Sequence, residues 1–352
     1  MPSPLTPSPL TPSPLLEWPD AIPAGWPDEG VAAHYGDPAR EQRALDTSVG
    51  FVDRSNRGVV TVTGPDRLSW LHSLTSQHLE KLQPGDGAQA LVLDPNGHVE
   101  HHLTLTDDGT TTWIHTEPGQ AELLAAFLDS MRFMLRVEVA DVTLDHAVIS
   151  LLGPDQGDLA AGVEGIPVSG ATDRSSVMDL ILPRDRLAVT AEDLVRRGAA
   201  AAGMWAFEAL RIAAHEPRLG VDTDHRTIPH EVGWIDTAVH LNKGCYRGQE
   251  TVARVHNLGH PPRRLVFLNL DGSVDRLPSR GDPVELDGAV VGTTGSAARH
   301  YELGPIALAL VKRTVPVDAT LLAGGIAAAQ EVIVPPDAGA NVKVTLRKRT
   351  IV

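Results

Sequence analysis

The sequence has a single cysteine, Cys245, among 352 residues, which excludes an internal disulfide. One thiol fits a reducing compartment. The chain also has no apolar run approaching the roughly 18 residues that a membrane-spanning helix requires. No Lys or Arg precedes Arg40, so the cationic start of a secretory signal and the arginines of an organellar transit peptide are both missing. We therefore expect a soluble protein in the cytoplasm.

Positive charge is scarce as well. Lys and Arg total 30 against 45 Asp and Glu, which gives a net charge of −15 at pH 7. Such a surface repels phosphates, which argues against nucleic-acid partners and anionic membranes. No GxGxxG or GxxxxGK[ST] phosphate loop occurs, and there is no GxSxG nucleophile elbow. Hydride transfer on a dinucleotide and acyl transfer by a serine triad therefore have no support.

The chain divides by composition. At the amino terminus, MPSPLTPSPLTPSPL repeats a five-residue unit three times. Proline at this density opposes helix and sheet, so we expect residues 1–20 to be a disordered tail. From about HPPRR (260–264) onward, short strands are separated by Gly, Pro and Asp. We therefore predict an α/β region over residues 21–258 and a small β-barrel over residues 259–352.

Periodicity places several elements of the α/β region. RGVVTVTG (57–64) predicts a strand and PDRLSWLHSLTSQHLEKL (65–82) a helix; three strands within residues 88–116 and a helix over about 121–134 follow. The alanine-rich stretch 191–217 is the strongest helix signal, broken by Gly203 into what could be two helices. The stretch 221–250 has no sustained period and is too long for an idle connection, which favours a functional role.

The cysteine lies in KGCYRGQE (243–250). Lys243 and Arg247 are cations that favour a thiolate, and the flanking glycines let backbone amides approach the sulfur. Against a functional reading, most single cysteines are small buried hydrophobes whose chemistry is never used. The segment is polar and has no apolar period, which weakens that alternative. Whether the sulfur is exposed is left open by the sequence.

Two other polar stretches carry clusters of ionisable side chains. In NGHVEHHLTL (96–105), a strand would place His98, Glu100 and His102 on one face, and imidazoles with a carboxylate are ligands for zinc or iron. Solvated histidine faces are more common, so we assign no metal site. In RIAAHEPRLGVDTD (211–224), two cations and three carboxylates favour a surface salt-bridge network.

The segment NKGCYRGQETVARVHNLGHPPRRL resembles the signature of the YgfZ-type folate-binding proteins, relatives of the glycine-cleavage T-protein, an aminomethyltransferase. RGVVTVTGPDRLSWLHSLTSQHLEKLQPGDGAQALVLDPNGHVEHHL, EALRIAAHEPRLGVDTDHRTIPHE, AVVGTTGSA and GPIALALV are similar to the same family. The resemblance covers about residues 45–350. It implies an α+β, T-protein-like fold, in which two interleaved α/β subdomains surround a central folate pocket and a β-barrel forms the carboxy-terminal part.

The resemblance also implies a folate site. Asp179, in VMDLILP, stands where the family has an acidic side chain that recognises the pterin, and its two oxygens suit adjacent N–H donors. Arg211 matches an arginine that could pair with the carboxylate tail of the cofactor or with a pocket acid. Gln249, within the signature, is expected to contact the cofactor. That cofactor is tetrahydrofolate or a one-carbon derivative of it.

The sequence departs from the aminomethyltransferase pattern at one important place. Where those enzymes carry paired aspartates, His101 and His102 stand here. A neutral imidazole cannot supply the fixed charge of a carboxylate, although it can transfer protons. We therefore do not expect aminomethyl transfer, and we place both histidines in the folate site.

The expected function, by resemblance, is folate-dependent assembly or repair of iron–sulfur clusters in client proteins. Cys245 is the acting thiol, tuned by Lys243 and Arg247, because one thiolate can ligate a transient iron but is too few for a stable cluster. A folate-dependent one-carbon transferase or demethylase, with His101 or His102 as base, is the alternative. A non-catalytic scaffold with folate as a structural ligand is a third possibility.

Overall fold

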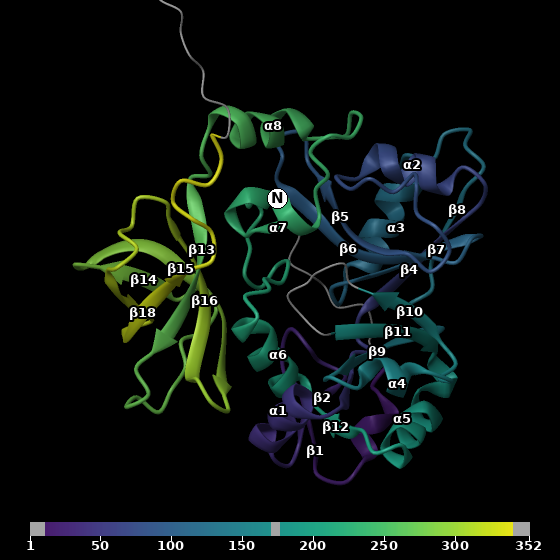
Figure 1. Ribbon diagram of the computed structural model, residues 1–352, viewed down its shortest axis with the longest axis horizontal. Coiled ribbons are helices and arrows are strands. Elements are labelled where there is room, and N and C mark those ends of the chain that lie inside the picture. The colour runs from purple at the N-terminus through teal and green to yellow at the C-terminus, as the bar shows by residue number, and fades with distance from the viewer. Residues whose placement is uncertain (1–10, 170–176, 341–352) are drawn as a thin grey trace, which may run out of the picture.

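Two β-sheets and a β-barrel surround the centre of the molecule (Figure 1). The structure is a computed structural model that describes residues 11–169 and 177–340. In Figure 1 the barrel lies at the left, one sheet at the upper right and the other at the lower right. The arrangement confirms the predicted T-protein-like architecture, with its mixed α/β sheets and closed carboxy-terminal barrel.

The upper sheet has five antiparallel strands in the order β5-β6-β7-β4-β8. Helices α2 and α3 pack against it, and their apolar faces share a core with alternate strand residues such as Leu103 and Leu105. The strands and helices are β4 (Gly58–Thr63), α2 (Arg67–Leu74), β5 (Gly87–Leu93), β6 (Val99–Asp107), β7 (Thr111–Thr116), α3 (Ala121–Ser130) and β8 (Glu138–Asp141).

The lower sheet has the order β10-β11-β9-β3-β12, in which only β12 and β3 are parallel. Its first strand, β3, precedes the whole upper sheet in the chain, and the other four follow it. The two α/β parts are therefore interleaved, as predicted. The elements are β3 (Gly50–Asp53), β9 (His146–Leu152), α4 (Gln156–Ala160), β10 (Ile166–Ser169), β11 (Val177–Pro183), η2 (Arg184–Arg186), α5 (Leu187–Arg196) and β12 (Ala200–Ala202).

The barrel closes in the order β13-β16-β15-β14-β17-β18. Its interior holds a compact aliphatic cluster that includes Val266, Leu268 and Val311, and its closure leaves no sheet edge open to pairing. The strands are β13 (Arg263–Leu270), β14 (Pro283–Leu286), β15 (Ala289–His300), β16 (Gly304–Lys312), β17 (Thr320–Ala323) and β18 (Ile326–Val332).

The remaining elements connect these three parts. Helix α6 lies between the barrel and the lower sheet and contacts α1, β2 and β15 (Figure 1). Within the described residues, no helix is both long and apolar enough to cross a bilayer. These elements are η1 (Pro14–Glu17), β1 (Ala21–Pro23), β2 (Ala32–Tyr35), α1 (Pro38–Thr47), α6 (Met204–Ala213), η3 (Pro229–Glu231), α7 (Trp234–Thr237) and α8 (Gln249–Leu258).

Two predicted helices differ from the structure. The helix predicted over residues 65–82 ends at Leu74, because the Ser76 N–H turns to donate to the carbonyl of Leu91 in β5. The stretch 191–217 contains the second half of α5 and the whole of α6, but the alanines between these helices form strand β12. Parallel pairing of Ala200–Ala202 with Gly50–Val52 outweighs the helix propensity of alanine.

The predicted disordered tail is wrong for its second half. Residues 1–10 lie outside the described residues, but Pro14–Glu17 form a 3-10 helix. The Ser13 hydroxyl accepts a hydrogen bond from the Leu15 N–H and donates to Asp53. Leu15 is fully buried in the core of the lower sheet. Each repeat contains one leucine, and this side chain is what allows the segment to dock. The high proline content of the repeat favours a disordered tail and gives no sign of such docking.

Candidate functional site

The loop that carries Cys245 is held at both ends while its sulfur faces outward. Cys245 is exposed, whereas Lys243 and Tyr246 on either side are buried. The Lys243 ammonium donates to the backbone carbonyls of His72, Thr75 and Gln77. Burial lowers the pKa of Lys243 to about 8. Lys243 therefore binds the end of α2 and the loop after it.

Arg247 and Gln249 also have partners within the chain. Arg247 pairs with Glu100 of β6, with 2.8 Å between Nη1 and Oε2. The Gln249 side-chain amide lies 3.4 Å from the carbonyl oxygen of Lys243, so it closes the loop at the start of α8. The structure thus gives Lys243, Arg247 and Gln249 contacts that fix the position of the loop.

Two glycines explain how closely this loop approaches β5 and β6. Gly248 has φ +80°, and a Cβ there would lie 2.6 Å from the carbonyl oxygen of Asp94. Gly97 has φ +84°, and a Cβ there would lie 2.9 Å from the Cβ of Thr251. Backbone thus packs on backbone where the signature loop meets the turn between β5 and β6.

The two neighbouring histidines of β6 lie on opposite faces of their strand. His101 faces the side of Phe127, with ring centroids 6.3 Å apart. His102 stacks on Trp234, with centroids 4.7 Å apart, and its Nε2 lies 3.2 Å from Gln89 Oε1. Burial lowers the pKa of each imidazole to about 4. Both rings are therefore neutral at pH 7, and they do not act on one common site.

The side chains of His98, Glu100 and His102 do not converge either. A bulge opposite Val92 and Leu93 interrupts the alternation of β6 at Glu100. His98 pairs with Asp94 at 2.9 Å, and Glu100 pairs with Arg247. The bulge thus breaks the common face that uninterrupted alternation would have produced.

Asp179 lies at the centre of a buried polar group. Its Oδ1 accepts hydrogen bonds from Ser150 Oγ at 2.5 Å and from Arg54 Nη1 at 3.3 Å. Its Oδ2 lies 2.9 Å from Nε2 of His115. Burial alone raises the pKa of Asp179, but the charge of Arg54 and the contact with His115 hold it well below its ordinary value. Asp179 is therefore an ionised carboxylate whose Oδ2 still has room for a further hydrogen-bond donor.

His115 is held as a neutral imidazole of defined tautomer. Arg57 Nε donates to its Nδ1 at 2.8 Å, and a guanidinium can only donate. The proton of the neutral ring must therefore sit on Nε2, which faces Asp179. Burial is the main reason that the pKa of His115 falls to about 4.

The group around Asp179 continues into a chain of buried ion pairs. Arg57 pairs with Glu117, and Arg218 joins Glu117 at 2.7 Å to Asp28 at 2.9 Å and Glu208 at 3.0 Å. Because Arg211, Arg218 and Asp222 are buried, the predicted surface network at 211–224 is wrong for these three residues. Asp224, by contrast, forms a partly exposed pair with Arg263. The linked charges are four guanidiniums and five carboxylates: Arg54, Arg57, Arg211, Arg218, Asp28, Glu117, Asp179, Glu208 and Asp222.

Arg211 connects this chain to the barrel. Its guanidinium pairs with Glu208 at 2.6 Å and with Asp222 at 3.1 Å. Asp222 also accepts a hydrogen bond from the backbone N–H of Ser296 in β15 at 2.6 Å. The neighbouring carboxylates outweigh the effect of burial and raise the pKa of Arg211. Arg211 is thus an interior cation at the junction of α6 and the barrel.

A cavity of about 470 Å³ adjoins this junction. Its walls are mostly apolar, with Arg211 and Glu216 among the charged groups. Leu152 of β9 and Val177 of β11 line it and lie opposite each other in the sheet. Ser150 and Asp179, two residues further along these strands, form another opposite pair on the same sheet face.

Phe207 contacts both the cavity and the Asp179 group. It lines the cavity, and the guanidinium of Arg54, which pairs with Asp179, lies 4.3 Å from its ring centroid. A second, smaller cavity of about 60 Å³ is lined by His102, Trp234 and Glu216. Glu216 lines both cavities. His102, which lines the smaller cavity, is therefore connected to the larger one through a single shared residue.

Sequence reasoning placed Asp179 and Arg211 but missed most of their partners. Arg54, Arg57, His115, Glu117 and Arg218 come from three separate parts of the chain. The only local signal is the position of Glu117 directly after a buried strand. Residues up to 190 apart meet here, as Asp28 and Arg218 do, and no single-sequence pattern reports such pairs.

Comparison with known proteins agrees with this architecture. The family model described as the GCVT N-terminal domain matches residues 27–172. The chain is 28% identical over 317 residues to a putative chloroplastic transferase of Arabidopsis thaliana, covering 79% of this chain and 70% of that protein. It is also 28% identical to an aminomethyltransferase of Symbiobacterium thermophilum, covering 82% and 84% of the two chains.

The fold is similar to that of a solved structure. The glycine cleavage system aminomethyltransferase T of Bartonella henselae superposes with a TM-score of 0.77 at 18% identity, covering 94% of this chain and 98% of that one. Residues 27–172 therefore match the GCVT N-terminal domain model, in a chain that has the T-protein-like fold and aminomethyltransferase-like relatives.

Proposed function

We propose that this protein binds tetrahydrofolate, or a one-carbon derivative of it, and acts as a cytoplasmic accessory factor in iron–sulfur cluster assembly or repair, with Cys245 as its working thiol. The observation that carries the folate part is the cavity of about 470 Å³ beside Arg211 and the buried ion-pair chain. Its volume lies within the range of small-molecule sites, which are mostly apolar with few polar groups.

Asp179 suits the pterin end of such a ligand. A carboxylate offers about four lone-pair positions; Ser150 and Arg54 donate to Oδ1, and Nε2 of His115 lies 2.9 Å from Oδ2. The linked network also has five carboxylates for four guanidiniums, so it has acceptor capacity for the amino and ring N–H donors of a pterin. In this proposal the pterin end of the ligand reaches Asp179 beside Phe207, which lines the cavity.

Arg211 suits the carboxylate tail of the ligand. It lines the cavity and is held in place by Glu208 and Asp222. A guanidinium in this position can exchange one carboxylate partner for a carboxylate of the cofactor.

The exposure of Cys245 supports the cluster part of the proposal. The sulfur faces solvent from a loop anchored by Lys243, Gly248 and Gln249. A single accessible thiolate can ligate a transient iron or carry a persulfide, whereas a resident cluster needs more ligands. The partners that follow from this role are iron–sulfur client proteins or their assembly factors.

A one-carbon transferase is the second candidate, and His102 is the observation in its favour. His102 is neutral, stacks on Trp234 and lines the small cavity that shares Glu216 with the larger one. A neutral imidazole can accept a proton from a folate-bound group. Turnover of a methylamine donor with tetrahydrofolate that is lost in His102→Gln would favour this role.

Anaerobic calorimetric titration with tetrahydrofolate tests the pocket. We expect saturable binding that weakens about tenfold or more in Asp179→Asn, because a charged acceptor is lost. Asp107→Asn is the matched control, since Asp107 forms a buried ion pair with Arg67 in another part of the chain. Equal affinity of wild type and Asp179→Asn would remove Asp179 from the site.

The cluster role needs a separate experiment. Cells that lack the gene are complemented with wild type or Cys245→Ser at equal expression, and the activity of a radical-type iron–sulfur enzyme is measured. We expect only wild type to restore it. Full restoration by Cys245→Ser would leave a folate-binding scaffold or transferase as the better interpretation.

A further inference from the structure

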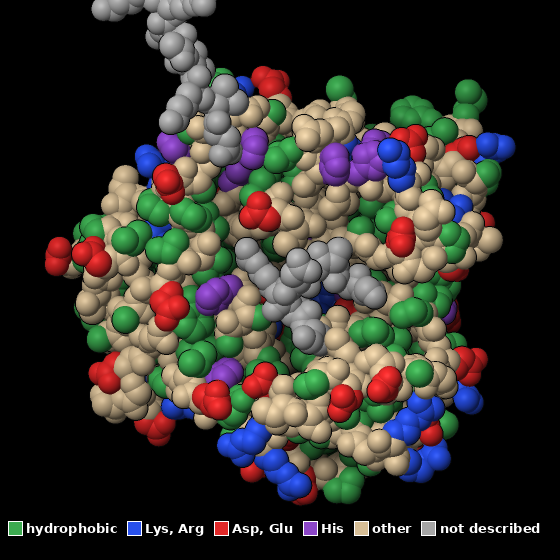
Figure 2. Space-filling model, in the orientation of Figure 1, with side chains coloured by type: hydrophobic (Ala, Val, Ile, Leu, Met, Phe, Trp, Pro, Cys, Tyr) green, Lys and Arg blue, Asp and Glu red, His purple; other side chains and the backbone are tan. Residues whose placement is uncertain are grey.

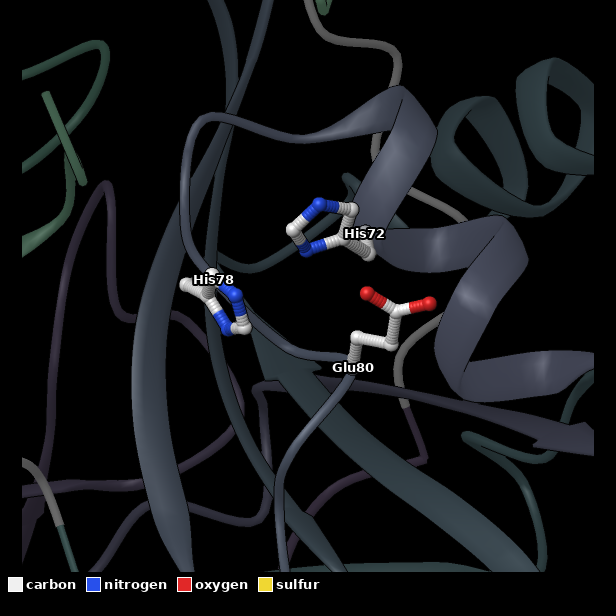
Figure 3. A group of neighbouring side chains, drawn as sticks. All are labelled: His72, His78 and Glu80. Carbon is white, nitrogen blue, oxygen red and sulfur yellow. The ribbon is translucent and has the colours of Figure 1, made fainter. Parts of the chain in front are cut away.

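We propose that His72, His78 and Glu80 form a binding site for one divalent first-row transition-metal ion, of the Zn²⁺ and Fe²⁺ class. His72 comes from the last turn of α2, and His78 and Glu80 come from the loop that follows. Figure 3 shows the three side chains turned toward one another. The site is distinct from the folate cavity and from the Asp179 group.

The geometry is close to that of a metal centre. One ligand atom from each residue lies within 4.8 Å of those of the other two. Bonds of ~2.0–2.2 Å to a tetrahedral ion place donor atoms roughly 3.4 Å apart. Small rotations of two imidazoles and one flexible carboxylate are enough to close that difference. Among the described residues, this is the one group of three or more such side chains that meets this spacing.

An unpartnered imidazole atom points independently to a ligand. Nδ1 of His72 is buried, and no described residue forms a hydrogen bond with it. Several other imidazole nitrogens of the described residues also lack a hydrogen-bond partner, but only that of His72 belongs to the group of three metal-ligating side chains, and an ion is one of the explanations for such an atom. Burial, followed by the charge of Lys243, lowers the pKa of His72, so the ring is neutral and available as a ligand at pH 7.

The backbone around the site is fixed before any ion binds. Lys243 holds the carbonyls of His72, Thr75 and Gln77. The Gln77 side chain accepts a hydrogen bond from the His78 N–H at 2.9 Å. The lysine of the signature loop therefore orders the segment that presents both histidines. Its positive charge weakens cation binding, and the three carbonyls around it and the Glu80 carboxylate reduce that cost.

A fourth donor lies close by. The ring of His240 is 5.2 Å from that of His78, centroid to centroid, and its backbone N–H donates to the Ser76 carbonyl at 2.9 Å. The ring centroids of His72 and His78 are 4.6 Å apart. Figure 2 shows neighbouring histidine side chains at the upper right of the face, near the position of α2 in Figure 1.

The donor set selects the class of ion. Two or three imidazoles with one carboxylate suit Zn²⁺, Fe²⁺ and Co²⁺, whereas Mg²⁺ and Ca²⁺ prefer sites made of oxygen ligands alone. Glu80 is exposed, so at least one coordination position faces solvent. Such a site can exchange its ion or a further ligand with a partner.

The test is a calorimetric titration of the untagged, chelator-treated full chain with Zn²⁺. We expect one ion per chain, and at least a tenfold loss of affinity in His78→Ala and in Glu80→Gln. His225→Ala is the matched control, because His225 is an exposed histidine outside the group, and it should bind as wild type does. Cys245→Ser should also bind normally, which separates this site from the thiol.

Further measurements identify the ion and guard against misfolding. Co²⁺ bound at the site should give the strong visible absorption of a four-coordinate ion without a thiolate band, and excess Mg²⁺ should not displace it. Anaerobic competition ranks Fe²⁺ against Zn²⁺. The variants should match wild type in circular dichroism and thermal midpoint. Absence of saturable binding in wild type, equal binding in His78→Ala and wild type, or its loss in Cys245→Ser would each overturn the proposal.

Discussion

Arg57 Nε donates a hydrogen bond to Nδ1 of His115 at 2.8 Å, and this contact sets the proton position on a ring 58 residues away. Because Nδ1 must accept, the neutral ring carries its proton on Nε2, facing Asp179. We expect nitrogen NMR shifts of the Nε2–H tautomer at pH 7 and protonation only near pH 4, where burial places the pKa. Arg57→Gln should relax this preference. An Nδ1–H signal in the wild type would contradict the assignment.

The buried histidines should make stability depend on pH between about 6.5 and 4. The pKa of His101 falls from 6.5 to about 4 on burial, so the unfolded chain binds the proton first as the pH drops. Stability from this group is complete above pH 6.5 and falls by up to about 1.4 kcal/mol per pH unit below it. Urea unfolding should show a shallower slope for His101→Gln. His225→Gln, at an exposed position, should keep the wild-type slope, and a parallel slope for His101→Gln would refute the prediction.

Arg218→Met should be strongly destabilising. The guanidinium pairs with Asp28, Glu117 and Glu208, and its loss leaves buried carboxylates without a cation. The expected loss is about 3–5 kcal/mol in the free energy of unfolding. Arg254→Met, which breaks only the exposed pair with Glu250, should cost less than about 1 kcal/mol. Urea denaturation of the two variants side by side measures the difference. Similar losses for both would mean that the interior network is not a structural element.

Gly248→Ala should cost more than Gly220→Ala, although both glycines have nearly the same positive φ, +80° and +77°. Each substitution pays about 1–2 kcal/mol for a left-handed alanine. At Gly248 the new Cβ would also lie 2.6 Å from the Asp94 carbonyl oxygen, whereas at Gly220 nothing lies within 4 Å. Thermal unfolding measures both. Equal midpoints would show that the loop does not pack on Asp94 as described.

Leu15→Ala should destabilise the chain by about 2–5 kcal/mol, because Leu15 is fully buried in the core of the lower sheet. Leu16 is only half-buried, so Leu16→Ala in the same short helix is the control. Chemical denaturation should separate the two variants clearly. A neutral Leu15→Ala would restore the original prediction of a tail that contributes nothing to the fold.

The order of the helices and strands could be predicted well from the sequence, but their ends could not. Strand β4, the hairpin strands β5 to β7 and the barrel strands follow from alternation and turn residues, which are local signals. The end of α2 and strand β12 do not, because each depends on pairing with a distant strand. The burial of Leu15 was not predicted for the same reason, since the core cluster that it joins is built from β3, β9, β11 and α5.

The candidate site divides in the same way. The lone cysteine in its glycine-flanked loop, the acid at Asp179 and the cation at Arg211 are visible in the sequence because each stands in a recognisable motif. The burial of the ion-pair chain, the tautomer of His115 and the meeting of His72 with His78 and Glu80 were decided only by the tertiary structure. Residue type limits what chemistry a side chain can perform, but partners brought together by folding determine its charge, its orientation and what it can bind.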